Sequence, residues 1–298
     1  MNDISIHDIH EGQPIIALYT PPTDLTPGEV GLLYDNKFED REITATIIDL
    51  AMRGFVAIRK VPRSHVLGNY TVYEFELLRD DAGVLDLKRH EQAVLNGLFG
   101  VVGSVQMDKM QAGVTNPKTR EKIAGYYTGT EQVSMIGNRV CIDELRPYFY
   151  QYVSQAYMAA HAQLQRSDYL KHGSPLMAWS VLIVGAGLLA SAPVFARRAV
   201  LGNKARRYLD GFILYLNTAE VDRLGHTQAP QTVEQKEEGV KLYKTYLPYA
   251  IALGLESEWS QQFQSAYTES PMWISGETDI SVLALQSSVA VALQQARL

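Results

Sequence analysis

The sequence has a single cysteine, Cys141, among its 298 residues. One cysteine excludes an internal disulfide framework and any zinc site built from several cysteines. Its neighbours Val140 and Ile142 are apolar, which predicts a small buried side chain and not a nucleophile. Basic charge is also scarce, because 27 Lys and Arg stand against 33 Asp and Glu, a formal net charge of −6. We therefore expect no general binding of nucleic acid, which requires a basic face.

The sequence also lacks the short motifs of common enzymes. It has no Gly-x-Ser-x-Gly elbow and no Walker loop, and His90-Glu91 lacks the second histidine of a zinc protease. We interpret His90-Glu91 as a helix surface and the stretch HDIHEG as a flexible polar arm. A weak metal site at His7 and His10 is the alternative for that arm. We predict no catalytic residue, no cofactor and no metal. The opening residues also lack the basic region of a secretory signal.

Local patterns predict helices and a hairpin in the first third of the chain. Thr26 and Glu29 are spaced as a capping box for a short helix with Val30, Leu33 and Tyr34 facing inward. Apolar residues at helical spacing predict a second helix over 40–54, stopped by Gly54. FVAIRKV and YTVYEFELL alternate with period two, which predicts a hairpin whose turn occupies residues 62–69. Helices followed by a hairpin is the order of a winged helix.

The remainder of the chain is predicted to be mainly helical, so the expected fold class is mainly α (α+β). Residues 86–100, 143–170, 206–216 and 239–263 have helical patterns, and Tyr148, Tyr152 and Tyr157 are expected to be core or packing contacts. We divide the chain into four parts. These are an arm with a winged-helix-like domain (1–84), a helical second winged-helix-like region (85–173), a hydrophobic segment (174–198) and a helical C-terminal domain (199–298).

A long apolar run, from Leu176 to Ala196, contains no charged residue. Its length suffices for a transmembrane helix, since about 20 residues cross a bilayer core. A buried helix of a soluble fold is a second interpretation. The third is a Gly-x-Gly-x-x-Ala dinucleotide turn at Gly185 and Gly187. Pro193 disfavours it, because the helix that should follow the turn would be broken. Of the three interpretations, we favour the membrane-inserted segment.

Basic residues follow this run in the stretch RRAVLGNKARR. Such a cluster beside an apolar segment attracts anionic lipid headgroups and favours a cytoplasmic location for that end. Trp179 near the other end is suited to a membrane interface. The predicted lipid contacts are Trp179, Arg197, Arg198, Lys204, Arg206 and Arg207.

Several motifs in a fixed order resemble a bacterial family of predicted membrane proteins of unknown function, typified by the YciQ-like proteins. The motifs are Pro21-Pro22, Pro27–Gly31, Asp40–Thr46, Leu50–Phe55, Leu247–Gly254 and Trp259. The resemblance spans roughly residues 15–275. It implies a cytoplasmic winged-helix-like region, a membrane hairpin and a helical tail, with Arg41, Pro248, Tyr249 and Trp259 as motif residues of interest. This chain has one apolar segment where the family has two, so that segment could span, re-enter or be buried.

From these features we predict a non-enzymatic cytoplasmic module of a bacterial inner-membrane protein, acting as a protein-interaction or assembly scaffold. The expected partners are membrane lipids and an unknown protein. One alternative is a nucleotide-binding oxidoreductase that uses the Gly185/Gly187 turn. Another is a DNA-binding regulator, which the charges on helix 40–54 disfavour, because Asp40, Glu42 and Asp49 outnumber Arg41 and Arg53 there.

Overall fold

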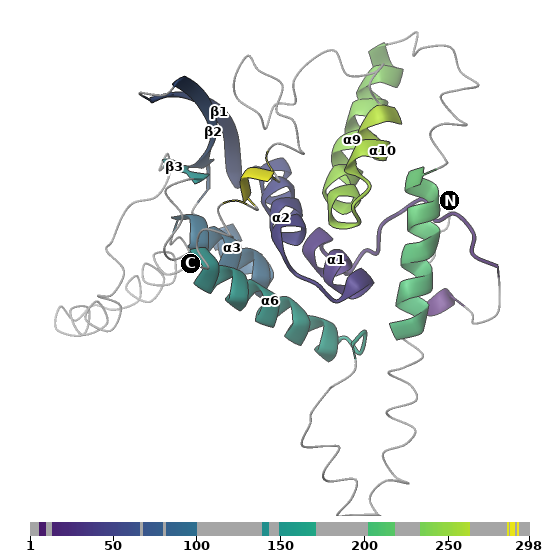
Figure 1. The fold of residues 1–298 in the computed structure, drawn as a ribbon. Helices are drawn as coiled ribbons and strands as arrows, with labels where there is room; N and C mark the ends of the chain where they lie inside the picture. The colour runs from purple at the N-terminus through teal and green to yellow at the C-terminus, as the bar shows by residue number, and fades with distance from the viewer. Residues whose placement is uncertain are drawn as a thin grey trace, which may run out of the picture. The chain divides into compact units, whose positions relative to one another are not determined.

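The computed structural model describes residues 6–9, 14–65, 68–79, 82–99, 139–142, 149–170, 202–217, 233–262, 285, 287–289 and 291. The chain forms two compact units, each made from two stretches of sequence. We call them the arm unit (Met1–Phe38 with Ala160–Ala266) and the hairpin unit (Glu39–Ala159 with Tyr267–Leu298). The described residues are mainly helical with one small antiparallel sheet, which confirms the predicted α+β class (Figure 1). The four-part division of the sequence stays a prediction.

The sheet of the hairpin unit contains the predicted hairpin. Strands β1 (Val56–His65) and β2 (Gly68–Leu77) pair antiparallel, and β3 (Arg139–Cys141) adds to the other side of β2. The predicted turn at 62–69 is too long, because pairing continues to His65 opposite Gly68. Backbone hydrogen bonds extend the ribbon past the last alternating apolar residue, so hydrophobic periodicity underestimates its length. Cys141 is buried, as predicted.

Helix α2 (Asp40–Met52) opens the hairpin unit. The backbone N–H of Glu39 donates to Glu42 Oε2 at 2.8 Å, and Gly54 with φ of 78° ends the helix as predicted. Glu42 and Thr44 lie off the apolar positions that the helical spacing predicts for the core, yet both are buried. The Thr44 hydroxyl donates to its own helix, at 2.7 Å from the Asp40 carbonyl oxygen. A polar residue satisfied in this way tolerates burial, and sequence periodicity does not reveal it.

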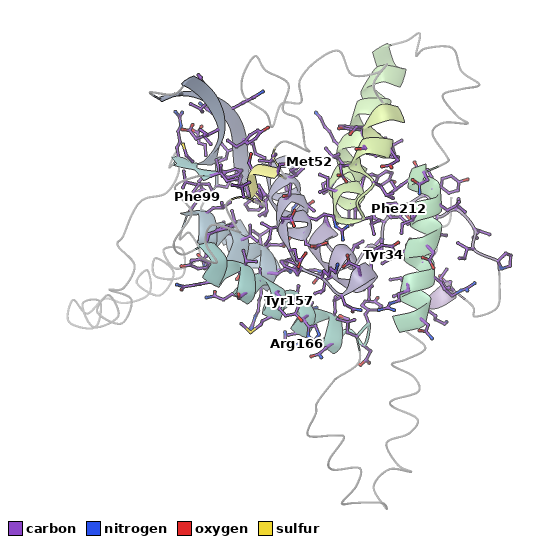
Figure 2. The ribbon with its side chains drawn as sticks, viewed as in Figure 1. Tyr34, Met52, Phe99, Tyr157, Arg166 and Phe212 are labelled. Carbon is purple, nitrogen blue, oxygen red and sulfur yellow. The ribbon has the colours of Figure 1, made fainter. Side chains whose placement is uncertain are left out.

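Two further helices complete the described core of the hairpin unit. After a 3-10 turn η2 (Ala82–Asp86), α3 (Arg89–Phe99) packs closely against the first part of α6 (Phe149–Arg166), whose residues up to Ala159 belong to this unit. A Cβ placed on Gly97 would lie 2.9 Å from the Phe149 ring and from Tyr152 Cβ. Tyr157, predicted to be a core or packing contact, is exposed on α6, where the buried positions are Phe149, Val153, Ala156, Ala160 and Leu164 (Figure 2).

The prediction that His90 and Glu91 lie on a helix surface is wrong. Both side chains are buried, with exposed fractions of 1% and 2%. They are buried because Arg53, contributed by the end of α2, forms an ion pair with Glu91. A buried carboxylate is tolerated when a cation pairs with it and further hydrogen bonds satisfy its oxygens.

The arm unit contains a short 3-10 turn η1 (Ile6–Asp8), the helix α1 (Pro27–Asp35), a helix over 202–217, α9 (Val233–Ala252) and α10 (Glu256–Gln262). The capping box of α1 is confirmed, because the Thr26 N–H donates to Glu29 Oε2 at 2.9 Å. Tyr34 is exposed and does not face inward as expected. Ile6, which precedes the stretch HDIHEG, is buried.

Several predictions fall on residues outside the described part of the chain. These are the apolar run 176–196 with Gly185, Gly187 and Trp179, the basic residues Arg197 and Arg198, Tyr148, and most of the second winged-helix-like region. Within the part that is described, no helix combines the length and the apolar character needed to cross a bilayer.

Candidate functional site

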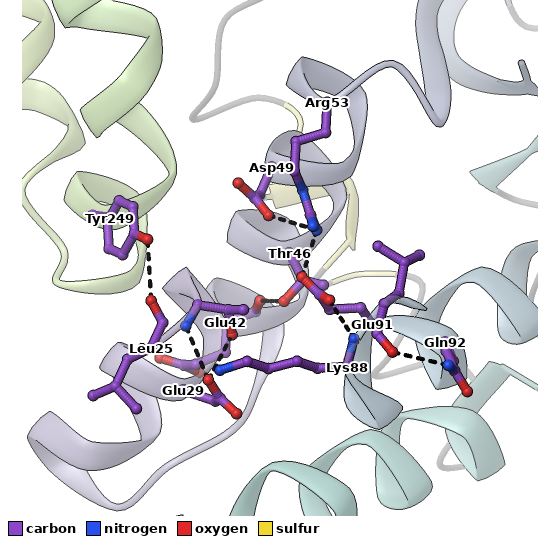
Figure 3. A network of polar contacts seen from close by, with 12 residues as sticks. Leu25, Glu29, Glu42, Thr46, Asp49, Arg53, Lys88, Glu91, Gln92 and Tyr249 are labelled. Atoms are coloured by element: carbon purple, nitrogen blue, oxygen red, sulfur yellow. Dashed lines mark hydrogen bonds and ion pairs between the residues drawn. The ribbon is translucent and has the colours of Figure 1, made fainter. Parts of the chain in front are cut away.

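Four tyrosine hydroxyls hold the extended segment 14–25, which we call the arm, against helices of the arm unit. Three donate to backbone carbonyl oxygens and one to a carboxylate, over 2.6–3.1 Å: Tyr208 to Thr20, Tyr246 to Tyr19, Tyr249 to Leu25, and Tyr169 to Asp24 (Figure 3 for Tyr249). We call these residues the tyrosine clamp. Because most of its acceptors are backbone atoms, the clamp fixes the path of the arm.

The arm also makes a very close approach to helix 202–217 at Gly211. The N–H of Leu18 donates to the Gly211 carbonyl oxygen at 3.0 Å. A Cβ on Gly211 would lie only 2.5 Å from the Ile16 carbonyl oxygen, which is too close for a side chain of any size. Glycine is therefore required in this helix so that the arm can lie directly on its backbone.

Aromatic rings fill the space beneath the arm. Neighbouring rings have centroids 5.1–6.3 Å apart, mostly edge to face, and belong to Tyr19, Phe212, Tyr215, Tyr246, Tyr249 and Trp259. Phe212 points from helix 202–217 toward α9 (Figure 2). Trp259 is fully buried, and its indole N–H donates to the Tyr243 carbonyl oxygen at 3.3 Å. Such ring pairs contribute about 0.5–1.5 kcal/mol each beyond their burial.

Tyr169 joins three parts of the arm unit. Its hydroxyl binds Asp24 of the arm, and its backbone follows the end of α6. Its carbonyl oxygen lies against the start of helix 202–217, since a Cβ on Gly202 would be 2.8 Å from it. The two described ends that flank residues 171–201 therefore touch each other.

The phenol hydroxyl of Tyr169 stays protonated and can therefore always donate a hydrogen bond. Burial, the hydrogen bond to Asp24 and the negative charges of Asp24 and Glu29 all raise the pKa of Tyr169. The phenol therefore keeps its proton throughout the physiological range and remains able to donate to Asp24.

The motif residues of the C-terminal part meet in the arm unit. Tyr249 is in the clamp, Trp259 is in the aromatic cluster, and Pro248 is buried inside α9. Arg41 belongs to the hairpin unit, where its Nε lies 3.2 Å from Glu42 Oε1.

The predicted lipid contacts are described only in part. Lys204, Arg206 and Arg207 lie in the first two turns of helix 202–217, where Arg206 is exposed and the other two are half-buried. Trp179, Arg197 and Arg198 lie outside the described residues.

A second polar group ties α2 to α3 inside the hairpin unit (Figure 3). Arg53 lies 2.8 Å from Asp49 Oδ2 and also forms a short ion pair with Glu91 Oε1, while Glu91 Oε2 accepts the Lys88 N–H at 2.7 Å. Burial raises the pKa of Asp49 to about 6, with Arg53 opposing and Glu91 adding to the shift. Burial and the charges of Lys88 and Arg53 lower the pKa of His90 to about 3.

The charged groups of this cluster are engaged with one another and with the backbone. One carboxylate oxygen of Glu91 accepts a hydrogen bond from Arg53, and the other accepts one from the backbone N–H of Lys88. The lowered pKa of His90 keeps this buried side chain neutral. Among the described residues, no group of His, Cys, Asp and Glu is arranged to hold a metal ion.

Comparison with known proteins places this architecture in a family. Residues 16–263 match the family described as "Predicted membrane protein (DUF2207) C-terminal domain". The chain belongs to that family. The matched range begins on the arm and ends one residue after α10, so it contains the tyrosine clamp, the aromatic cluster and the hairpin. The family is one of predicted membrane proteins of unknown function, which confirms the resemblance at that level. No curated protein and no solved structure matches the chain.

Sequence reasoning missed the clamp residues Tyr169, Tyr208 and Tyr246, and also Gly202 and Gly211. Tyr246 and its acceptor Tyr19 are 227 positions apart, so no local spacing connects them. The available signal was weaker. Glycines at the start and in the interior of a strongly apolar helix pattern suggest close approach of another backbone.

Proposed function

We propose that this chain is a non-enzymatic, cytoplasm-facing module of a bacterial inner-membrane protein of the YciQ-like type, and that it acts as a protein-interaction or assembly scaffold. Membership of a family of predicted membrane proteins supports the location. The described polar clusters support a structural role, because their charged groups are engaged with one another. Arg53 and Glu91 are the clearest example.

The contact between Tyr169 and Gly202 is the observation that carries the proposal. A single crossing separates its two ends by about 30 Å of hydrocarbon. Here the chain leaves at Tyr169 and returns at Gly202, with the two residues in van der Waals contact. The proposal therefore places both flanks of the apolar run on one side of the membrane. The basic residues after Ala196 favour the cytoplasmic side.

The hairpin unit is proposed to be winged-helix-like, with the order helix α2, strand β1, strand β2. A role in protein contacts is favoured over DNA binding, because Arg53 and Arg59 are already paired with carboxylates. Arg59 lies 2.6 Å from Glu76 Oε2, and Arg53 is shared by Asp49 and Glu91. Guanidinium groups paired in this way release few counterions on meeting a phosphate backbone.

Extraction of membranes from cells that express the chain tests the location. The proposal expects the chain in the membrane fraction after a carbonate wash and its release by detergent. Recovery as monodisperse protein without detergent would contradict it.

Titration calorimetry with NAD(H) tests the rival function, a nucleotide-binding enzyme. Saturable micromolar binding that Gly187→Trp abolishes would favour that enzyme and replace this proposal. Steeply salt-dependent binding to duplex DNA would favour the regulator instead.

A further inference from the structure

Four large apolar side chains are exposed on the arm and on the helix beneath it. Ile15, Ile16 and Tyr19 are 47%, 56% and 51% exposed, and Leu214 of helix 202–217 is 39% exposed. Leu214 is one turn from Gly211, on whose backbone the arm lies. We call these four residues the apolar strip.

The strip is held rigidly, so its exposure is not fraying of a chain end. Leu18, between Ile16 and Tyr19, is buried and hydrogen-bonded to Gly211. The Tyr19 ring stands against Tyr215, with centroids 5.1 Å apart and planes at 61°. Its carbonyl oxygen is fixed by Tyr246. The arm unit thus keeps an apolar surface in place at an energetic disadvantage in water.

The helix that carries Leu214 also carries positive charge. Helix 202–217 brings Lys204, Arg206 and Arg207 in its first two turns, and Asp210 is its one acidic residue. Arg206 is exposed. The start of this helix touches Tyr169, at the point where the chain leaves for and returns from the apolar run. Apolar side chains flanked by cations form the surface that anionic bilayers bind.

We propose that the apolar strip is a lipid-facing surface of the arm unit, resting in the headgroup region of an anionic bilayer, with Arg206 of the same helix as Leu214 binding the anionic headgroups. The inference rests on the proposed function, because it takes the arm unit to be held at the membrane by the adjacent apolar run. It goes further by giving Ile15, Ile16, Tyr19 and Leu214 a binding role.

Depth-sensitive fluorescence on the full chain tests this assignment. In a Cys141→Ser background, single cysteines replace Ile16, Leu214 or Met158 and carry an environment-sensitive dye. Met158 is the matched control, because it is an exposed apolar residue of the hairpin unit. In vesicles containing phosphatidylglycerol, brominated lipids are expected to quench the dye at residues 16 and 214 several-fold more than at 158. Arg206→Gln should reduce quenching at residue 16 in these vesicles and leave it unchanged in purely zwitterionic ones.

Equal quenching at the three positions would overturn the lipid assignment. A blue-shifted dye at residue 16 that brominated lipids do not quench would overturn it as well, by showing that protein covers the strip. The fate of the proposed function is measured separately, with a membrane-impermeant maleimide at Asp168→Cys and Asn203→Cys. Labelling of both from one face with an unquenched strip rejects the lipid surface alone. Labelling from opposite faces rejects both proposals.

Discussion

The hydroxyl of Tyr169 donates a hydrogen bond to Asp24 Oδ2 across 2.6 Å, and so joins residues 145 positions apart in the sequence. The bond ties the arm to the end of α6, at the point where Gly202 returns beside the Tyr169 carbonyl oxygen. The arm, the exit of the chain toward the apolar run and the return from it are therefore parts of one packed body. A substitution that loosens any one of these three parts is therefore expected to loosen the packing of the other two.

Tyr169→Phe removes only the hydroxyl that binds Asp24. Hydrogen bonds to charged groups contribute about 1.5–3 kcal/mol, and exposure of Asp24 places this one at the lower end. We expect urea unfolding to give a loss of about 1–2 kcal/mol. Tyr34→Phe, the same change at an exposed tyrosine, should alter stability by less than about 0.5 kcal/mol. Equal effects of the two variants would show that the clamp does not stabilise the fold.

Gly211→Ala should loosen the arm while keeping the helix. Alanine favours a helix by about 1 kcal/mol over glycine, but its Cβ would collide with the Ile16 carbonyl oxygen 2.5 Å away. We expect faster thermolysin cleavage within the arm with little change in helical circular dichroism. Asn217→Ala, at an exposed position of the same helix, is the control and should leave cleavage unchanged. An arm as protected in Gly211→Ala as in the wild type would rule out the close packing.

His90 should make the protein sensitive to acid. Its pKa is about 3 in the folded state, against an ordinary value of 6.5. Between these values the unfolded chain binds the extra proton, so stability falls as the pH drops below 6.5, by about 1.4 kcal/mol per pH unit. His90→Gln is expected to remove the contribution of His90 to this pH dependence. Unfolding free energies at pH 7 and pH 5 measure it, and an unchanged difference in the variant would refute the assignment.

Asp49 should act in the opposite direction over part of the same range. Its pKa is raised from 3.8 to about 6, so the folded state binds the proton more tightly and stability falls as the pH rises from about 4 to about 6. Asp49→Asn is expected to make the acid sensitivity of the protein steeper, whereas His90→Gln should leave the opposite dependence that Asp49 contributes, so that stability rises from pH 7 to pH 5. The same pair of measurements at pH 7 and pH 5 serves here. A shallower dependence in Asp49→Asn would contradict the origin given for the shift.

Local features of the fold could be predicted because local chemistry determines them. The Thr26 and Glu29 pair starts α1 through two hydrogen bonds within one turn. Gly54 ends α2 because its φ of 78° favours a residue without a Cβ. Alternation over Val56 to Leu77 predicts the hairpin because one face of the sheet is buried.

The site could not be predicted in the same way, because its contacts are long-range and involve the backbone. The tyrosine clamp binds carbonyl oxygens, which every residue has, so the sequence of the arm does not indicate its partners. His90 and Glu91 looked like surface residues, since the compensating Arg53 lies 38 positions before Glu91. Gly202 and Gly211 are explained only by the carbonyl oxygens of Tyr169 and Ile16 that lie against them.

Cysteine labelling in oriented vesicles tests the central claim most directly. The full chain carries Asp168→Cys or Asn203→Cys in a Cys141→Ser background, and an impermeant maleimide is applied to inside-out and right-side-out inner-membrane vesicles. Because Tyr169 and Gly202 are in contact, the account predicts that both positions are labelled in inside-out vesicles and protected in right-side-out ones. Labelling of the two positions in vesicles of opposite orientation would contradict it.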